Sequence, residues 1–213
     1  MKLKVCGNKV NIEEVATLEP DYLGFIFWEP SARYFDGELA VLPKKIKKVG
    51  VFVDADFSNI TDKIIKYDLE LVQLHGTESP DYCSELFAQM KKTTGREIGI
   101  IKVFTIKDTF NFDRLKPYES VCDYYLFDTK GPLPGGNGYA FDWSILKDYP
   151  SSKPFFLSGG IGNESVEEIK AFMGTMVSEL CEVIDVNSRF ESEPGHKIIE
   201  ELRRFRDFLD GEY

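Results

Sequence analysis

Two residues of this chain could work together as an acid–base pair, Cys6 and Asp128. Cys6 lies near the end of the apolar run 3–7, and Asp128 ends a similar run over 124–128. A thiolate can accept a proton, and a carboxylic acid can donate one. Taken singly, each has a simpler explanation, because free cysteine is usually a small buried apolar residue and aspartate often caps a turn. As a pair at two strand ends, they indicate proton-transfer chemistry.

A second group of residues has the composition of a phosphate-binding site. Gly159 and Gly160 follow the apolar run that starts at residue 154, and a helix is expected to begin near Asn163. Glycines let backbone N–H groups approach an anion, and a helix N-terminus adds a favourable dipole. A tight turn would explain the glycines equally well. Asn187 and Ser188 stand at the matching place after the next run, which favours phosphate binding.

A third segment, residues 130–138, holds four glycines and two prolines. We expect it to close over a bound substrate with Gly136 and Gly138 against the ligand, although a solvated connector has a similar composition.

The elements that must position these residues recur along the whole chain. Eight short runs are rich in β-branched and aromatic residues and are mainly apolar rather than alternating, as is typical of parallel strands covered on both sides. They span residues 3–7, 22–27, 49–53, 69–75, 98–104, 124–128, 154–160 and 183–188.

Segments with helical character lie between these runs. Start signals stand at residues 11–15, 58–65, 79–82 and 163–169, and a last helix is expected over about 194–209. Eight strands alternating with eight helical segments predict an α/β fold, a single (βα)8 TIM barrel over residues 1–213. The competing doubly wound sheet would have five or six units, and no dinucleotide-binding glycine motif follows the first strand. In a barrel, the C-terminal strand ends carry the site, and the unusual residues gather there.

Composition excludes several classes of function. The formal charge of −10 would repel nucleic acid, and no apolar run is long enough to cross a membrane. The four cysteines and two histidines lack the spacing of a metal site, so we expect no metal. No secretory signal is seen, which makes a cytoplasmic location with reduced thiols the expectation.

Eight sequence blocks follow one another from residue 4 to about 197. They are Lys4-Val5-Cys6-Gly7, Gly24-Phe25-Ile26-Phe27 with Ser31-Ala32-Arg33-Tyr34, Val49-Gly50-Val51-Phe52, Val72-Gln73-Leu74-His75-Gly76, Phe127-Asp128-Thr129, Gly135-Gly136-Asn137-Gly138, Ser158-Gly159-Gly160-Ile161, and Asp185-Val186-Asn187-Ser188 with Glu191 and Pro194-Gly195. Together and in register, these blocks resemble the phosphoribosylanthranilate isomerase family.

The resemblance implies an isomerase of tryptophan biosynthesis that needs no cofactor. Its substrate would be N-(5-phosphoribosyl)anthranilate, which an Amadori rearrangement converts to 1-(2-carboxyphenylamino)-1-deoxyribulose 5-phosphate. Cys6 would be the general base and Asp128 the general acid, while Arg33 would hold the anthranilate carboxylate. His75 could contact substrate or simply pack at the rim of the fourth strand. The expected partner is this phosphorylated small molecule, and a monomer and a homodimer both stay open.

Three positions depart from the common pattern of the family. Asn187 stands where serine is common, Arg189 where glycine is common, and Asn137 where threonine is common. The arginine could add a cation to the phosphate site or point to solvent. Glu191 and His196 are interpreted as structural residues near the start of the last helix.

Other functions remain in competition with this one. Among phosphate-binding barrels, the sugar isomerase of histidine biosynthesis would carry an acid in place of Cys6. Indole-glycerol-phosphate synthase would use lysine and glutamate. A barrel that only binds a phosphorylated metabolite or a protein would have no need of both Cys6 and Asp128.

The assigned roles also raise a problem of protonation. A working Cys6 must be ionised and a working Asp128 protonated, the reverse of what their ordinary pKa values give at neutral pH. Burial and the anionic substrate would raise the pKa of Asp128, and a cationic Schiff base would acidify the proton that Cys6 removes. We therefore expect the substrate to create much of the required protonation state.

Overall fold

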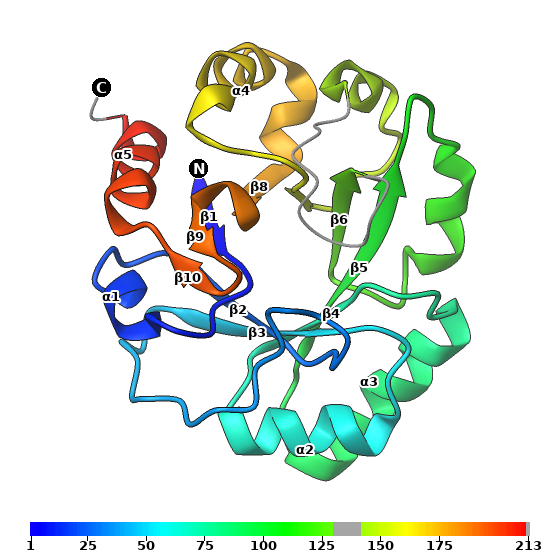
Figure 1. The fold of residues 1–213 in the computed structure, drawn as a ribbon. Coiled ribbons are helices and arrows are strands. Elements are labelled where there is room, and N and C mark those ends of the chain that lie inside the picture. The colour runs from blue at the N-terminus through cyan, green and yellow to red at the C-terminus, as the bar shows by residue number, and fades with distance from the viewer. Residues whose placement is uncertain (130–141, 212–213) are drawn as a thin grey trace.

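The structure is a computed structural model that describes residues 1–129 and 142–211 of the 213-residue chain. Eight parallel strands pair in chain order and close into a barrel, with β8 pairing with β1 (Figure 1). The strands are β1 (Lys2–Val5), β2 (Tyr22–Ile26), β3 (Lys47–Phe52), β4 (Leu71–Leu74), β5 (Gly99–Ile106), β6 (Tyr124–Thr129), β7 (Phe155–Leu157) and β8 (Cys181–Val186). The predicted eight-stranded barrel is confirmed.

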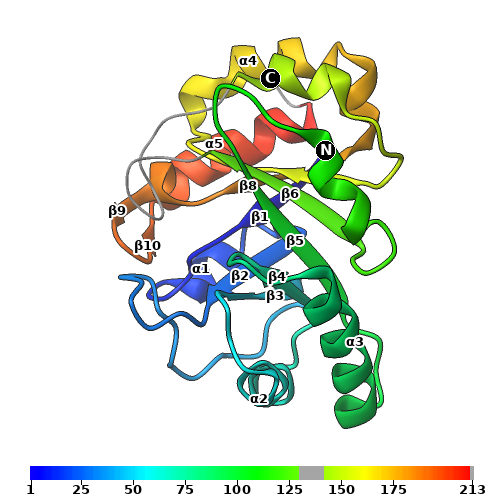
Figure 2. The same ribbon diagram turned by 90° about the vertical axis from the view of Figure 1, so that its right-hand side faces the viewer.

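Helices and 3₁₀ turns surround the barrel, as the two views in Figures 1 and 2 show. The α-helices are α1 (Ile12–Ala16), α2 (Phe57–Tyr67), α3 (Pro80–Thr94), α4 (Val166–Met173) and α5 (Ile199–Asp210). The 3₁₀ helices are Phe112–Tyr118, Trp143–Asp148, Asn163–Ser165, Met176–Leu180 and Ser188–Phe190. Local signals set the ends of α3: the Ser79 hydroxyl accepts from the Tyr82 N–H at 3.1 Å, and Gly95 ends the helix at φ +67°.

The expectation of eight helical segments is wrong in one connection. Residues 27–46 link β2 to β3 without a helix. The segment holds Pro30, Gly37 and Pro43 and lacks a repeating apolar face, so a helix would gain little by forming there.

The last helix also starts later than predicted. It was expected from about residue 194, but α5 begins at Ile199, and the preceding residues form an antiparallel hairpin of β9 (Glu191–Glu193) and β10 (His196–Lys197). Gly195 turns this hairpin at φ +86°. Asn11, the first residue of the start signal at 11–15, does not cap α1 with its side chain and instead exchanges two hydrogen bonds of 2.9 Å with the backbone of Lys197. This ties the hairpin to the connection after β1.

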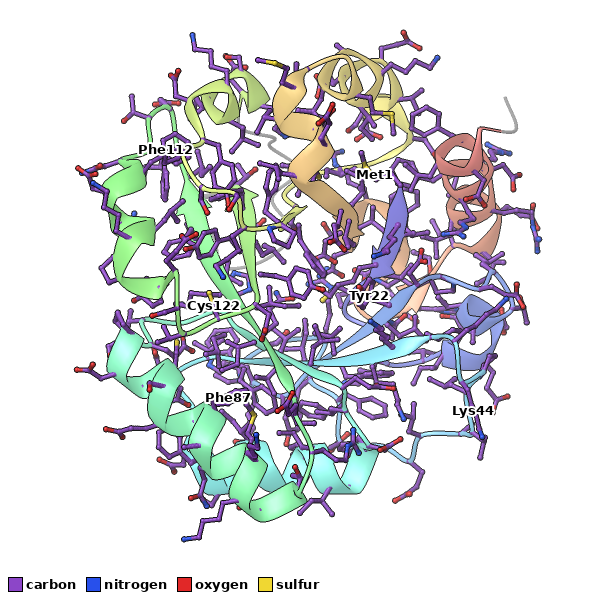
Figure 3. All side chains as sticks on the ribbon, turned by 180° about the vertical axis from the view of Figure 1, so that it is seen from behind. Met1, Tyr22, Lys44, Phe87, Phe112 and Cys122 are labelled. Atoms are coloured by element: carbon purple, nitrogen blue, oxygen red, sulfur yellow. The ribbon has the colours of Figure 1, made fainter. Side chains whose placement is uncertain are left out.

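The core has two layers. Side chains fill the barrel interior, where Tyr22 is labelled in Figure 3. The apolar interior layer consists of Tyr22, Val49, Leu71, Ile101, Val103, Leu126, Phe156 and Val183. A larger cluster packs between the strands and the helices.

Strand alternation determines what lies above the apolar interior layer. Residues two apart in a strand share a face, so Gln73 follows Leu71 and Asp185 follows Val183 on the interior side. Lys4 of β1 hydrogen-bonds both of them and is buried with them. Cys6 comes two residues after Lys4 and His75 two residues after Gln73, and both lie at the C-terminal rim. The barrel interior therefore changes from apolar to charged just below the predicted site.

Candidate active site

Cys6 lies directly after β1 at the C-terminal rim of the barrel. Its N–H donates to the Val186 carbonyl at 2.8 Å, which continues the β1–β8 pairing, and the residue is only 5% exposed. Gly24 of β2 faces it. A Cβ at Gly24 would lie 2.8 Å from Cys6 Sγ, so a larger residue there would displace the sulfur.

Asp128 lies near the end of β6, with His75 beside it from the end of β4. The Nε2 atom of His75 is 3.4 Å from Asp128 Oδ2, and both side chains are partly exposed. The other carboxylate oxygen accepts from the Thr129 N–H at 2.9 Å. The structure thus places His75 against the predicted general acid, a contact that the sequence did not indicate.

A hydrogen-bonded chain leads from His75 into the barrel. Lys4 Nζ donates to Asp185 Oδ2 at 2.9 Å and to Gln73 Oε1 at 2.7 Å. Gln73 Nε2 lies 3.5 Å from His75 Nδ1. Lys4, Gln73 and Asp185 belong to the family blocks in the sequence, but no site role was predicted for them. A signal was present, since Lys4 stands two residues before Cys6 and Gln73 two residues before His75.

The Cys6 thiol is surrounded by charged groups. Burial raises its pKa, which disfavours the thiolate. The Lys4 ammonium opposes this rise, the Asp185 carboxylate adds to it, and the Lys197 ammonium and the Gly7 N–H oppose it. Without a ligand the site therefore favours the protonated thiol.

Arg33, the predicted carboxylate binder, is held by Glu191 at the same rim. Its Nε lies 2.8 Å from Oε2 and 3.0 Å from Oε1, and its Nη2 lies 2.6 Å from Oε2. Lys197 Nζ donates to Glu191 Oε1 at 2.7 Å and to Asn187 Oδ1 at 2.9 Å. Arg33 also lies close to Gly7, the residue after Cys6, since a Cβ at Gly7 would be 2.7 Å from Arg33 Cδ.

The electrostatics of this rim cluster favour a charged Glu191. Burial would raise the pKa of Glu191, but hydrogen bonds and charge from Arg33 and Lys197 hold it below its ordinary value. Burial lowers the pKa of Lys197, against the attraction of Glu191. Glu191, read from the sequence as structural, is thus the residue that orients Arg33.

The predicted phosphate residues lie at the ends of two adjacent strands. Gly159 and Gly160 follow β7 with φ of +100° and +67°, and the 3₁₀ turn that leads into α4 begins three residues later. Asn187 follows β8, which pairs with β7, and Ser188 opens the next 3₁₀ turn. The structure brings the two glycines and these two residues to neighbouring strand ends.

Arg189 links the two phosphate-site loops. Its Nε is 3.2 Å from Glu164 Oε1, and both side chains are largely exposed. Arg189, for which the sequence left open a cation at the phosphate site or a side chain in solvent, is engaged by a carboxylate of the loop after β7.

Gly136, Gly138 and the departure at Asn137 lie outside the described residues. Within residues 1–129 and 142–211, no three His, Cys, Asp or Glu side chains come together as a metal-binding group. No helix in these two ranges is long and apolar enough to cross a membrane.

Comparison with known proteins finds a match over almost the whole chain. Residues 3–207 match the family model described as N-(5'phosphoribosyl)anthranilate (PRA) isomerase. The chain belongs to the phosphoribosylanthranilate isomerase family. The resemblance inferred from eight sequence blocks is therefore confirmed, and with it the assignment to an enzyme family.

Individual members of the phosphoribosylanthranilate isomerase family are similar over nearly their full length. The isomerase of Parabacteroides distasonis is 41% identical, and the match covers 96% of this chain and 91% of the relative. The crystal structure of the Thermotoga maritima isomerase has a TM-score of 0.77 at 28% identity, with 99% of both chains covered. Another isomerase structure, with a TM-score of 0.73 at 26% identity and 99% of both chains covered, holds reduced 1-(o-carboxyphenylamino)-1-deoxyribulose 5-phosphate.

Proposed function

We propose that this chain converts N-(5-phosphoribosyl)anthranilate to 1-(2-carboxyphenylamino)-1-deoxyribulose 5-phosphate in tryptophan biosynthesis. The observation that carries the proposal is the family match over residues 3–207, in a chain whose Cys6 and Asp128 lie at one rim of the barrel. A structural relative that binds the reduced form of this product supports the choice of ligand.

The two residues would divide the proton transfers of an Amadori rearrangement. Asp128 donates a proton to the furanose oxygen, the ring opens, and a cationic Schiff base forms. Cys6 then removes the proton on C2′ as a thiolate, and the resulting enolamine tautomerises to the ketone. The reaction is an isomerisation, so its atoms balance without a cofactor.

The anionic groups of the substrate would be held at two places. Arg33 takes the anthranilate carboxylate: Glu191 occupies its Nε and Nη2, and no hydrogen bond in the described part of the chain occupies Nη1. His75, Gly136 and Gly138 would also contact the substrate.

The phosphate would be bound by Gly159, Gly160, Asn187 and Ser188 at the ends of β7 and β8. Backbone N–H groups suit this role, because they add local positive potential to a chain with a net charge of −10.

Binding of the substrate would also favour the thiolate form of Cys6 that the reaction needs. Burial raises the pKa of Cys6 in the ligand-free site, so the thiolate is scarce before the substrate arrives. The cationic Schiff base would then favour proton transfer to sulfur. If so, the pH profile of kcat differs from that of kcat/KM; identical profiles would count against this role of the substrate.

Substitution of the two residues tests their assignment. Cys6→Ser and Asp128→Asn should each lower kcat by about 10²- to 10⁴-fold with little change in KM, measured with purified substrate. Cys122→Ser and Asp123→Asn are matched controls. Both residues come just before the first residue of β6, at the end of the strand away from the site.

Near-normal turnover in Cys6→Ser or Asp128→Asn would remove that residue from its role. The function as a whole is tested by rescue of a strain that lacks this isomerase. A soluble, unmutated chain that fails to restore growth without tryptophan would overturn it.

A further inference from the structure

Lys4 is a fully buried lysine in the barrel interior, directly below the predicted base. It precedes Cys6 by two residues, so both side chains share the interior face. Its ammonium donates to Asp185 Oδ2 and Gln73 Oε1, from β8 and β4. The family chemistry described above gives this lysine no part. Burying an ammonium is costly unless it is paired, so a role is worth seeking.

We propose that Lys4, held by Asp185, is a positioning residue for both members of the acid–base pair. Its charge stabilises the Cys6 thiolate, and its hydrogen bond to Gln73 fixes the tautomer of His75 beside Asp128. This inference rests on the proposed function, which assigns the base role to Cys6 and the acid role to Asp128. Its two physical effects, on the Cys6 pKa and on the His75 tautomer, can nevertheless be measured without turnover.

The first effect is electrostatic. The charged groups with the largest effects on the Cys6 pKa are Lys4 on its own strand, Asp185 on β8 and Lys197 on β10. The influence of Lys4 on the thiol pKa exceeds that of Asp185, so the pair as a whole favours the thiolate. Asp185 Oδ1 is buried without a hydrogen-bond partner among the described residues. Asp185 thus fixes Lys4 through Oδ2 and partly offsets its charge at the sulfur.

The second effect depends on the side-chain amide of Gln73, which contacts both Lys4 and His75. An amide oxygen only accepts hydrogen bonds and its nitrogen only donates, so the contact from Lys4 to Oε1 assigns the NH2 group of Gln73 to the side of His75. His75 Nδ1 must then accept, which leaves the ring proton on Nε2. That proton faces Asp128 Oδ2, which lies 3.4 Å from Nε2. Lys4 therefore determines which ring nitrogen of His75 meets the predicted acid.

The electrostatic effect is tested by titrating Cys6 in protein labelled with ¹³C at cysteine Cβ, with Cys6→Ser used to assign the signal. Lys4→Met should raise the pKa of Cys6 by about one pH unit or more, a tenfold loss of thiolate. Asp185→Asn should lower the pKa, because it removes the carboxylate whose charge opposes the thiolate. A purely structural role would not shift the pKa in opposite directions. The control Asp21→Asn makes the same chemical change at the opposite end of the barrel and should leave Cys6 unchanged.

The tautomer is tested by ¹⁵N NMR of the His75 ring near neutral pH. The unmutated protein should show protonated Nε2 and unprotonated Nδ1. Gln73→Met and Lys4→Met should both give a mixture of tautomers, whereas Asp21→Asn should keep the single form.

Several results would overturn the proposal. They are an unchanged Cys6 pKa in folded Lys4→Met, shifts of the same sign in Lys4→Met and Asp185→Asn, or a unique His75 tautomer in Gln73→Met. If Lys4→Met fails to fold, Asp185→Asn alone decides the electrostatic effect, and the absence of a downward shift refutes it.

Failure of the proposed function would look different. A chain that shows both NMR effects but does not isomerise the substrate retains the positioning role of Lys4 and loses only the assigned reaction. A chain that isomerises the substrate without the NMR effects keeps the reaction and loses the role of Lys4.

Discussion

Two buried lysine–carboxylate pairs in this barrel differ in what surrounds them. Lys4–Asp185 lies inside the barrel. Lys102–Glu78 lies outside it, since Lys102 alternates with the interior residues Ile101 and Val103. Lys102 Nζ donates to Glu78 Oε2 at 2.9 Å and to two backbone carbonyls, and Glu78 accepts from backbone N–H groups through both oxygens. In the interior pair, Asp185 Oδ1 has no partner among the described residues.

The outer pair uses all its polar atoms in hydrogen bonds, whereas the interior pair leaves one carboxylate oxygen without a partner among the described residues. Every polar atom of the outer pair is used to fix backbone after β3 and β4, as expected of an ion pair that holds backbone in place. The interior pair leaves part of its charge to act on Cys6. Burial of an ion pair is thus weak evidence of function, and the completeness of its hydrogen bonds is more informative.

The largest expected effect comes from breaking the outer pair. Lys102→Met would leave Glu78 buried without a cation, so we expect the free energy of unfolding to fall by about 3–5 kcal/mol, measured by urea denaturation. Lys91→Met is the control, because its ion pair with Glu97 is exposed and should contribute less than about 1 kcal/mol. A loss for Lys102→Met no larger than this would show that the outer pair is not structural.

Replacement of both partners should sharpen the contrast. Lys4→Met/Asp185→Leu should cost less than about 2 kcal/mol of stability but lower kcat at least about tenfold, since the pair itself is replaced by apolar groups. Lys102→Met/Glu78→Leu should cost more than about 3 kcal/mol, because backbone N–H groups of Asp54 and Gly76 lose their acceptor. Denaturation and steady-state assays of the two double variants measure this. Equal stability losses would erase the distinction.

The smallest effect concerns a third buried carboxylate, Glu191 at the rim. Because its folded-state pKa lies below its ordinary value of 4.5, it stabilises the protein above that pH, and this contribution is lost as pH falls through the lower value. Glu191→Gln should therefore lose less stability on acidification from about pH 5 to pH 3 than the unmutated chain. Glu193→Gln, in the same hairpin but exposed, should behave like the unmutated chain. Parallel acid curves for Glu191→Gln and the unmutated protein would contradict the lowered pKa.

Much of the fold could be predicted because its strands are buried on both faces. Runs such as 22–27 and 49–53 are apolar throughout, and their spacing left few alternatives to a barrel. The 3.6-residue pattern near the C-terminus was real but began later, since Asn11 holds Lys197 in a hairpin. That contact joins residues 186 apart, which no local pattern reveals.

The site was predictable at the strand ends and not below them. Cys6, Asp128, Gly159 and Asn187 all lie at the C-terminal rim, as the repeat implied. Lys4 could have been found by counting two residues back from Cys6. The binding of Arg33 to Glu191 and of Lys197 to Asn187 depends on how the hairpin packs on the rim, so no residue spacing predicts it.

The hydrogen bond between Lys4 and Asp185 joins residues 181 apart, at the two edges that close the barrel. While the chain is being synthesised, Lys4 and Cys6 emerge early, and Asp185 emerges only near the end. Until β8 docks on β1, the ammonium is hydrated and the thiol is open to oxidants. The reactivity of Cys6 towards a pulse of alkylating reagent therefore reports when β8 docks on β1.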